Sequence, residues 1–292
     1  MPKGMKQWGF WCLILMGMVS GNAQLGTLTK SRVSSGDVSL MTRLILPETP
    51  MAQKPPVVII VHGSGRRGNW TTYRPLISRF SQQGMAVVFF DKRGTGASGG
   101  RFLKVTTETS KDVFDTLSDD VVAVAQWTKR QAGIDTTRIG VLGFSQGGWI
   151  APLVACKSEL IKFSIMISGP IYSLGHETLF SKLAGDARGK EPVDWEEINT
   201  KLRAFNADRG FDSEEYVTQL AIPSLWLFGE KDTSMPVTFS KQNLDTILAR
   251  APERPFKYIV YPNANHSLYD VDTKERIPYG RDVRQWLLSE LY

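Results

Sequence analysis

The sequence predicts an α/β fold in which a mostly parallel sheet carries helices on both faces. Short apolar runs of strand length alternate with longer amphipathic segments along most of the 292 residues. The run from Val57 to Val61 contains only valine and isoleucine, as expected of a strand that is buried on both faces. Strands that alternate with helices are joined by crossovers, and such strands pair in parallel.

The apolar runs give the expected positions of the strands and helices. Strands are expected at residues 38–46, 57–61, 85–90, 138–142, 163–167, 222–228 and 256–261, and helices at 112–131, 146–156, 237–250 and 279–291. The charged stretch from 170 to 221 interrupts this alternation and is too long for a simple crossover. We therefore expect one domain, residues 24–292, with a helical cap inserted at about 171–221.

The N-terminal segment has the features of a secretory signal. Lys3 and Lys6 precede an uncharged apolar run at 8–19, and small and polar residues follow as far as Ala23. As a helix, this run would rise only about 18 Å, which is short of a hydrocarbon core of about 30 Å. We expect residues 1–23 to be a cleaved signal peptide of an exported protein, periplasmic or secreted, with no stable membrane insertion after cleavage. An uncleaved anchor or an ordered helix is the alternative.

Charge and cysteine content narrow the classes of partner. The net charge of +6 comes from scattered basic pairs with acidic residues between them, so nucleic-acid binding is not expected. Cys156 is the single cysteine after the signal, and its apolar surroundings predict a buried, inert thiol. Neither a cofactor nor a metal ion is expected.

The clearest chemical motif is Gly143-Phe144-Ser145-Gln146-Gly147. It lies between a predicted strand and a predicted helix, the context in which a Gly-x-Ser-x-Gly turn presents a nucleophilic serine. The flanking glycines leave room for neighbouring backbone, and the helix N-terminus favours a developing negative charge. Ser145 is therefore the candidate nucleophile.

A serine hydroxyl needs a base, and the chain has three histidines. In folds with this serine turn, the nucleophile is followed along the chain by the acid and then by the histidine. His62 precedes the serine, and His176 precedes the strand that should carry the acid, so His266 is the candidate base. It follows the last predicted strand.

Asp232, just past the strand at 222–228, is the candidate acid that orients His266. Its rivals are Glu230, Asp270 and Asp272. The last two follow the histidine, and Glu230 lies too close to the strand end, although it remains the alternative.

An oxyanion hole requires two hydrogen-bond donors aimed at the reacting oxygen. The N–H of Gln146 follows the nucleophile and supplies the first. The second is expected from the loop His62-Gly63-Ser64-Gly65, with Ser64 preferred and Gly65 as the alternative. His62 itself is expected to support this loop.

Together these segments resemble the α/β-hydrolase superfamily over nearly all of residues 24–292. The resemblance is carried by 62–65, 91–98, 143–148, 229–232 and 265–266. The segments 91–98 and 145–152 are similar to bacterial exported, esterase-like serine hydrolases related to the prolyl oligopeptidase catalytic domain and to acyl-CoA thioesterases. The resemblance implies a sheet of about eight strands, an inserted cap, and Asp91 and Arg93 as braces of the loop near the site.

The resulting hypothesis is a serine hydrolase that cleaves a small-molecule ester or acyl substrate through an acyl-enzyme. A peptidase or aminopeptidase with the same triad is the second hypothesis, and a thioesterase is a third. A binding module with an inactive hydrolase fold is the alternative outside enzymes. The natural substrate and the oligomeric state do not follow from the sequence.

Overall fold

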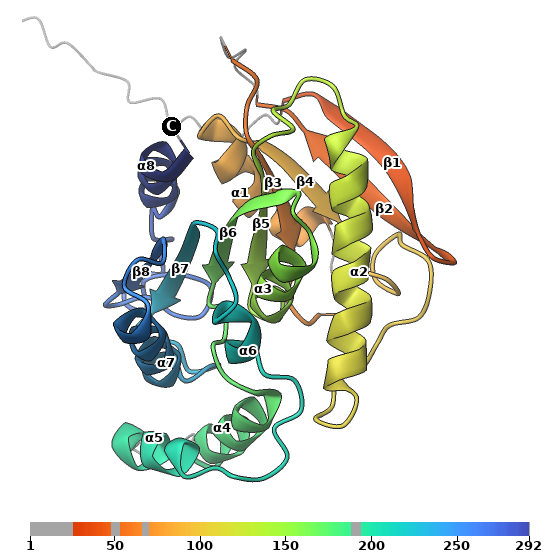
Figure 1. Ribbon diagram of the computed structural model, residues 1–292. Coiled ribbons are helices and arrows are strands. Elements are labelled where there is room, and N and C mark those ends of the chain that lie inside the picture. The colour runs from red at the N-terminus through yellow and green to blue at the C-terminus, as the bar shows by residue number, and fades with distance from the viewer. Residues whose placement is uncertain (1–25, 48–52, 66–69, 188–193, 292) are drawn as a thin grey trace, which may run out of the picture.

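The computed structural model describes residues 26–47, 53–65, 70–187 and 194–291. Its centre is an eight-stranded sheet in the order β1-β2-β4-β3-β5-β6-β7-β8 (Figure 1). The strands are β1 (Leu28–Ser35), β2 (Val38–Ile45), β3 (Val57–Val61), β4 (Ala86–Phe90), β5 (Ile139–Phe144), β6 (Ile161–Ile167), β7 (Ser224–Gly229) and β8 (Phe256–Tyr261). All pairs from β4 to β8 are parallel, whereas β1–β2 and β2–β4 are antiparallel. This confirms the predicted α/β fold with a mostly parallel sheet.

Helices cover both faces of this sheet. The helices are α1 (Trp70–Gln82), α2 (Ser110–Lys129), α3 (Gly147–Lys157), α4 (Leu174–Ala187), α5 (Trp195–Arg203), α6 (Glu214–Val217), α7 (Val237–Arg250) and α8 (Gly280–Leu291). The apolar cluster on one face includes side chains from α2, α3 and α7, and the cluster on the other face includes side chains from α1 and α8. In the part of the chain that is described, every helix is too short or too polar to cross a membrane.

Two elements were not expected from the sequence. In β1, only Val33 and Ser35 are buried, because the strand lies at the edge of the sheet and the rest of its side chains face solvent. The sequence of α1 is largely polar and contains Pro75, yet Ile77 and Phe80 are buried against the sheet. Each of these elements buries only a few side chains, so its apolar pattern is too short to be recognised in the sequence.

The segment between β6 and β7 contains α4, α5 and α6. Figure 1 shows α4 and α5 lying beyond one end of the sheet, away from the two helical layers. Leu174 and Glu177 of α4 line one cavity together with Ser145 and His266. The predicted signal peptide, residues 1–23, lies outside the described residues, as do 188–193 of the predicted cap.

The expectation of a buried Cys156 is wrong. The residue lies in the last turn of α3, where the side chain is exposed and the Sγ atom is 3.5 Å from the carbonyl oxygen of Tyr216. The buried face of α3 ends at Val154, so the helical turn carries position 156 away from the core.

Candidate active site

Ser145 occupies a tight turn between β5 and α3. Its φ of 53° lies in the left-handed region, which residues other than glycine adopt only with backbone strain. The Ser145 N–H donates to the Ile167 carbonyl oxygen at 3.0 Å, and its own carbonyl accepts from the Gly148 N–H at 2.7 Å. The turn is therefore held by the neighbouring strand β6 and by the first turn of α3.

The glycines on either side of Ser145 are required by packing. A Cβ atom at Gly143 would lie 2.2 Å from the Gly147 carbonyl oxygen, and one at Gly147 would lie 2.0 Å from the Val61 carbonyl oxygen. Both contacts are with backbone, so neither could be relieved by moving a side chain. This close approach brings the end of β3 against the start of α3.

His266 and Asp232 come from the loops that follow β8 and β7. The His266 Nδ1 atom is 2.7 Å from Asp232 Oδ2, and the Asp232 side chain is fully buried. Asp232 Oδ1 accepts hydrogen bonds from the N–H groups of Ser234 at 2.7 Å and Met235 at 3.2 Å. Because the carboxylate holds Nδ1, the imidazole keeps Nε2 available for another partner.

The remaining contacts of His266 fix the loop and the ring. Ser168 Oγ donates to the His266 carbonyl oxygen at 2.8 Å, and the Phe144 ring lies 5.6 Å from the imidazole, centroid to centroid. Ser168 also has a left-handed backbone, with φ of 49°. The loops after β5, β6 and β8 thus meet at one edge of the sheet.

Four of the five predicted site residues line a single cavity of about 170 Å³. Its lining consists of Ser64, Val105, Phe114, Ser145, Gln146, Trp149, Ser168, Pro170, Leu174, Glu177, Met235 and His266. The fifth residue, Asp232, lies behind His266. Among the described residues, the structure gives no acceptor for the N–H of Gln146 or of Ser64. Two donors therefore remain free next to Ser145, as an oxyanion hole requires.

The rival residues have other roles in the structure. Glu230 is exposed and lies 4.0 Å from Lys231, and the carboxylates of Asp270 and Asp272 accept from Asn263. His176 is buried in α4, where its Nδ1 lies 2.7 Å from Ser173 Oγ. Burial, assisted by the charge of Arg209, lowers the pKa of His176 to about 4.

Beneath the loop after β3 lies a buried His62–Lys92 pair. His62 Nε2 accepts from the Lys92 N–H at 3.2 Å, so the imidazole proton lies on Nδ1, which donates to the Gly63 carbonyl at 2.9 Å. Burial, with the Lys92 charge, lowers the pKa of His62 to about 3. The ring is a neutral support for the loop, as its sequence position suggested.

Lys92 was not expected at the site. Its Nζ donates to Gln146 Oε1 at 2.5 Å and to the Gly63 carbonyl at 3.0 Å, so one ammonium group joins the two loops that would supply the oxyanion donors. Burial lowers its pKa to about 7. The neighbouring residues that the resemblance named as braces do hold this loop: Asp91 Oδ2 accepts from the Ala97 N–H at 3.1 Å and pairs with Arg43 at 3.2 Å, and Arg93 pairs with Asp120 at 2.6 Å.

The opposite wall of the cavity carries a carboxylate, Glu177 of α4. The Tyr172 hydroxyl donates to Glu177 Oε2 at 2.6 Å. Burial raises the pKa of Glu177 to about 7, although the Tyr172 hydrogen bond and the nearby His266 act in the opposite direction. Glu177 was not among the residues expected at the site.

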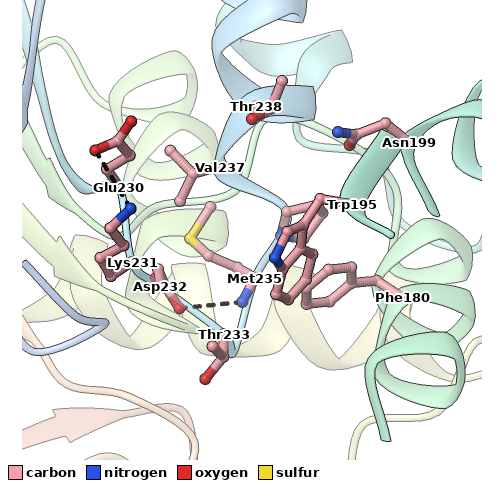
Figure 2. Close-up of a pocket in the computed structure, with 11 residues that line it drawn as sticks. Phe180, Trp195, Asn199, Glu230, Lys231, Asp232, Thr233, Met235, Val237 and Thr238 are labelled. Carbon is pink, nitrogen blue, oxygen red and sulfur yellow. Dashed lines mark hydrogen bonds and ion pairs between the residues drawn. The ribbon is translucent and has the colours of Figure 1, made fainter. Parts of the chain in front are cut away.

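A second cavity of about 320 Å³ adjoins the first at Met235, which lines both, and Asp232 lines the second cavity. In Figure 2, Phe180 of α4 and Trp195 of α5 form one side of it, and the loop from Glu230 to Val237 forms the other. The Phe180 and Trp195 rings are stacked, with centroids 6.4 Å apart. The site therefore has an adjoining cavity with two aromatic rings in its lining.

Known structures of hydrolases share this fold. An esterase of Pyrococcus furiosus superposes with a TM-score of 0.65 at 21% identity, covering 91% of this chain and 92% of that one. An acylaminoacyl peptidase of Pyrococcus horikoshii gives a TM-score of 0.62 at 18% identity, covering 91% of this chain and 41% of that one. At such identities the likeness concerns the fold alone.

Sequence comparison points to the same group of hydrolases. The Bacillus subtilis "Uncharacterized peptidase YuxL" is 24% identical over 244 residues, which are 81% of this chain and 35% of that protein. The chain thus spans about a third of that relative's length. Residues 71–291 match the model of the prolyl oligopeptidase family. The chain belongs to the prolyl oligopeptidase family.

Proposed function

We propose that the protein is a serine esterase in which Ser145, His266 and Asp232 form the catalytic triad. The observation that carries the proposal is the 2.7 Å hydrogen bond from His266 to the buried Asp232, in a cavity that Ser145 also lines. A carboxylate on Nδ1 fixes the tautomer in which Nε2 can accept a proton. That is the arrangement in which a serine hydroxyl becomes nucleophilic.

The reaction begins when Ser145 Oγ attacks the ester carbonyl and transfers its proton to His266 Nε2. The N–H groups of Gln146 and Ser64 hold the negative oxygen of the tetrahedral intermediate. The C–O bond to the alcohol then breaks, and His266 returns the proton to the departing alcohol. A water molecule, deprotonated by His266, attacks the acyl-enzyme; the acid leaves and Ser145 recovers its proton.

Peptide cleavage by the same groups is the second candidate, because the family and the Bacillus subtilis relative carry peptidase names. Esters are preferred here because the catalytic cavity of about 170 Å³ suits a short acyl or alcohol group.

Labelling with a fluorophosphonate tests the nucleophile directly. The folded protein should be labelled at Ser145, and Ser145→Ala should abolish the labelling without changing the thermal unfolding curve. Ser234→Ala is the matched control, because Ser234 lies beside Asp232 but its hydroxyl is outside both cavities. Undiminished labelling of the Ser145→Ala protein would contradict the proposal.

The reaction class is tested with matched substrates. Naphthyl acetate and naphthyl butanoate should be hydrolysed, whereas aminoacyl and peptidyl naphthylamides of equal size should react far more slowly. Turnover confined to the naphthylamides would replace the esterase proposal by the peptidase.

We also infer that the protein is exported, on the basis of residues 1–23 of the sequence. Expression of the whole chain in a Gram-negative host, followed by mass measurement, should find a periplasmic protein that begins at Gln24. An intact N-terminus in the cytoplasmic fraction would contradict this.

A further inference from the structure

We propose that Glu177 selects substrates that carry a positively charged ammonium group into the catalytic cavity. This inference rests on the proposal that Ser145 hydrolyses esters and names the class of ester. It begins from an unusual feature of the cavity: a carboxylate stands among side chains that are otherwise mostly apolar or hydroxylic.

Glu177 has no cationic partner among the described residues. Its recorded hydrogen bond comes from the neutral Tyr172 hydroxyl, and no ion pair includes it. Of the residues that line the cavity, only Glu177 and His266 are ionisable. Lys92, the buried cation of the site, lies under the opposite wall and is bound to Gln146 and Gly63.

The Tyr172 bond fixes where the carboxylate points. It occupies Oε2 and leaves Oε1 without a recorded partner among the described residues, on a side chain that lines the cavity. Tyr172 is itself fully buried between α3 and α7, against Trp149 and Phe239. The carboxylate is therefore held in place before a ligand arrives, which reduces the entropy lost on binding.

Charge in the cavity favours a cation over an anion. The groups that act on Glu177 are Tyr172 from the segment after β6, Asp232 after β7 and His266 after β8. Asp232 and His266 form a hydrogen-bonded pair that contributes at most one negative charge when the imidazole is neutral. An ammonium group next to Glu177 supplies the missing counter-charge, whereas an ester with a second carboxylate would meet two negative groups.

The preference for a cationic ester should depend on pH. Burial places the pKa of Glu177 at about 7, so the carboxyl is partly protonated near neutrality. A bound ammonium group stabilises the ionised form and lowers that pKa. The preference for a cationic ester should consequently increase as the pH rises through about 7 and should shrink below it.

The test compares isosteric ester pairs that differ in charge. In the acyl series, naphthyl 3-aminopropanoate is compared with naphthyl butanoate; in the alcohol series, butanoylcholine is compared with 3,3-dimethylbutyl butanoate. In at least one series, kcat/KM should be at least about tenfold higher for the cationic ester, as expected for a partly desolvated pair of opposite charges, which in the acyl series also includes a hydrogen bond. A hemisuccinate ester should be the poorest substrate.

Glu177→Gln is the decisive variant because its amide oxygen can still accept from Tyr172 while the charge is removed. It should erase the preference for the cation through KM, so that kcat/KM for the two esters of each pair differs by less than about twofold. Glu214→Gln is the matched control: Glu214 is also partly buried with a pKa raised by burial, but it lies in α6 and lines neither cavity. Loss of activity on neutral and cationic esters alike would overturn the proposal and place Glu177 in support of His266.

A binding measurement separates this proposal from the esterase proposal. Calorimetric titration of the Ser145→Ala protein with butylammonium chloride should give a dissociation constant at least about tenfold lower than with 1-butanol, and Ser145→Ala with Glu177→Gln should equalise the two. Equal affinities in the Ser145→Ala protein would overturn the role of Glu177 even if esters are hydrolysed. Tighter binding of butylammonium would support it even if ester hydrolysis fails.

Discussion

The two walls of the catalytic cavity differ in how their polar groups are satisfied. On the wall formed by the strand-end loops, Asp232 accepts three hydrogen bonds and Lys92 ties two loops together. On the wall formed by α4, Glu177 has one neutral partner and a free oxygen. The carboxylate of the first wall has hydrogen-bond partners on both oxygens without a ligand, whereas the carboxylate of the second wall has a partner on one oxygen. Rigid strand ends therefore suit the proposed chemistry, and the helical wall suits the choice of substrate.

The largest effect is expected from breaking the strand-end wall at Asp232. Asp232→Asn should lower kcat by about 10³- to 10⁴-fold, because an amide facing Nδ1 stabilises the wrong imidazole tautomer; the expected size comes from the corresponding change in chymotrypsin-like triads. Steady-state hydrolysis of naphthyl acetate measures the loss. Glu230→Gln, two residues earlier and exposed, should stay within about twofold of the unaltered enzyme. The opposite pattern would make Glu230 the acid.

The pH dependence of stability should have one sign for the buried histidines, His62 and His176, and the opposite sign for Glu177. The folded pKa of His62, about 3, lies below its unfolded value of 6.5, so the unfolded state binds the extra proton and stability falls as the pH drops from 6.5 to 3. The fall is on the order of 5 kcal/mol. His176 adds a smaller change of the same sign above about pH 4. The raised pKa of Glu177 acts in reverse, because the folded state binds the extra proton between 4.5 and about 7.

Urea unfolding between pH 3 and 8 measures these slopes. His62→Gln should flatten the fall below pH 6.5, and Glu177→Gln should steepen it between 4.5 and 6.5 by removing the opposing change. A slope that His62→Gln leaves unaltered would show that His62 is charged in the folded protein.

Breaking the bridge between the two oxyanion loops should have an intermediate effect. Lys92→Met retains the length of the side chain but removes the contacts to Gly63 and Gln146. We expect kcat to fall about 10- to 100-fold, with KM little changed, because displaced oxyanion donors weaken the transition state more than the bound substrate. Lys241→Met, at an exposed ion pair with Asp245 in α7, is the control.

The lowered pKa of Lys92 also predicts how kcat depends on pH. Its pKa of about 7 means that the ammonium loses its proton as the pH rises through neutrality. In the unaltered enzyme, kcat should fall over that pH range, and in Lys92→Met this fall should be absent. A fall of kcat that persists in the variant would have to come from another titrating group.

The arrangement of the strand-end wall was accessible from the sequence because parallel strands place their carboxyl ends at one edge. Ser145, Asp232 and His266 each follow a recognisable apolar strand, so chain order alone predicted that they would meet. The structure brings them to one edge of the sheet, as expected. Their catalytic roles remain predictions until the variants are measured.

The α4 wall was not accessible in the same way. Glu177 lies in the first turn of α4, and its burial depends on Tyr172 and on the packing of loops that are distant in the sequence. Lys92 illustrates the same limit, because a lysine beside an arginine normally indicates a surface. One signal was available for Lys92: it comes two residues after a fully buried strand, β4.

The smallest effect is expected from changing the second cavity, which is lined by Phe180 of α4 and Trp195 of α5. Trp195 is 43% exposed yet lines the second cavity, where its ring stacks on Phe180. If bulky esters extend past Met235 into this cavity, Trp195→Ala should raise KM for naphthyl esters about two- to tenfold, the range expected for one aromatic contact, and leave ethyl acetate unaffected. Leu288→Ala is the matched control, because Leu288 is 47% exposed but lies in α8, away from both cavities. An unchanged KM for naphthyl esters would restrict the substrate to the smaller cavity, where Glu177 and the strand-end loops would then account for all of the selectivity.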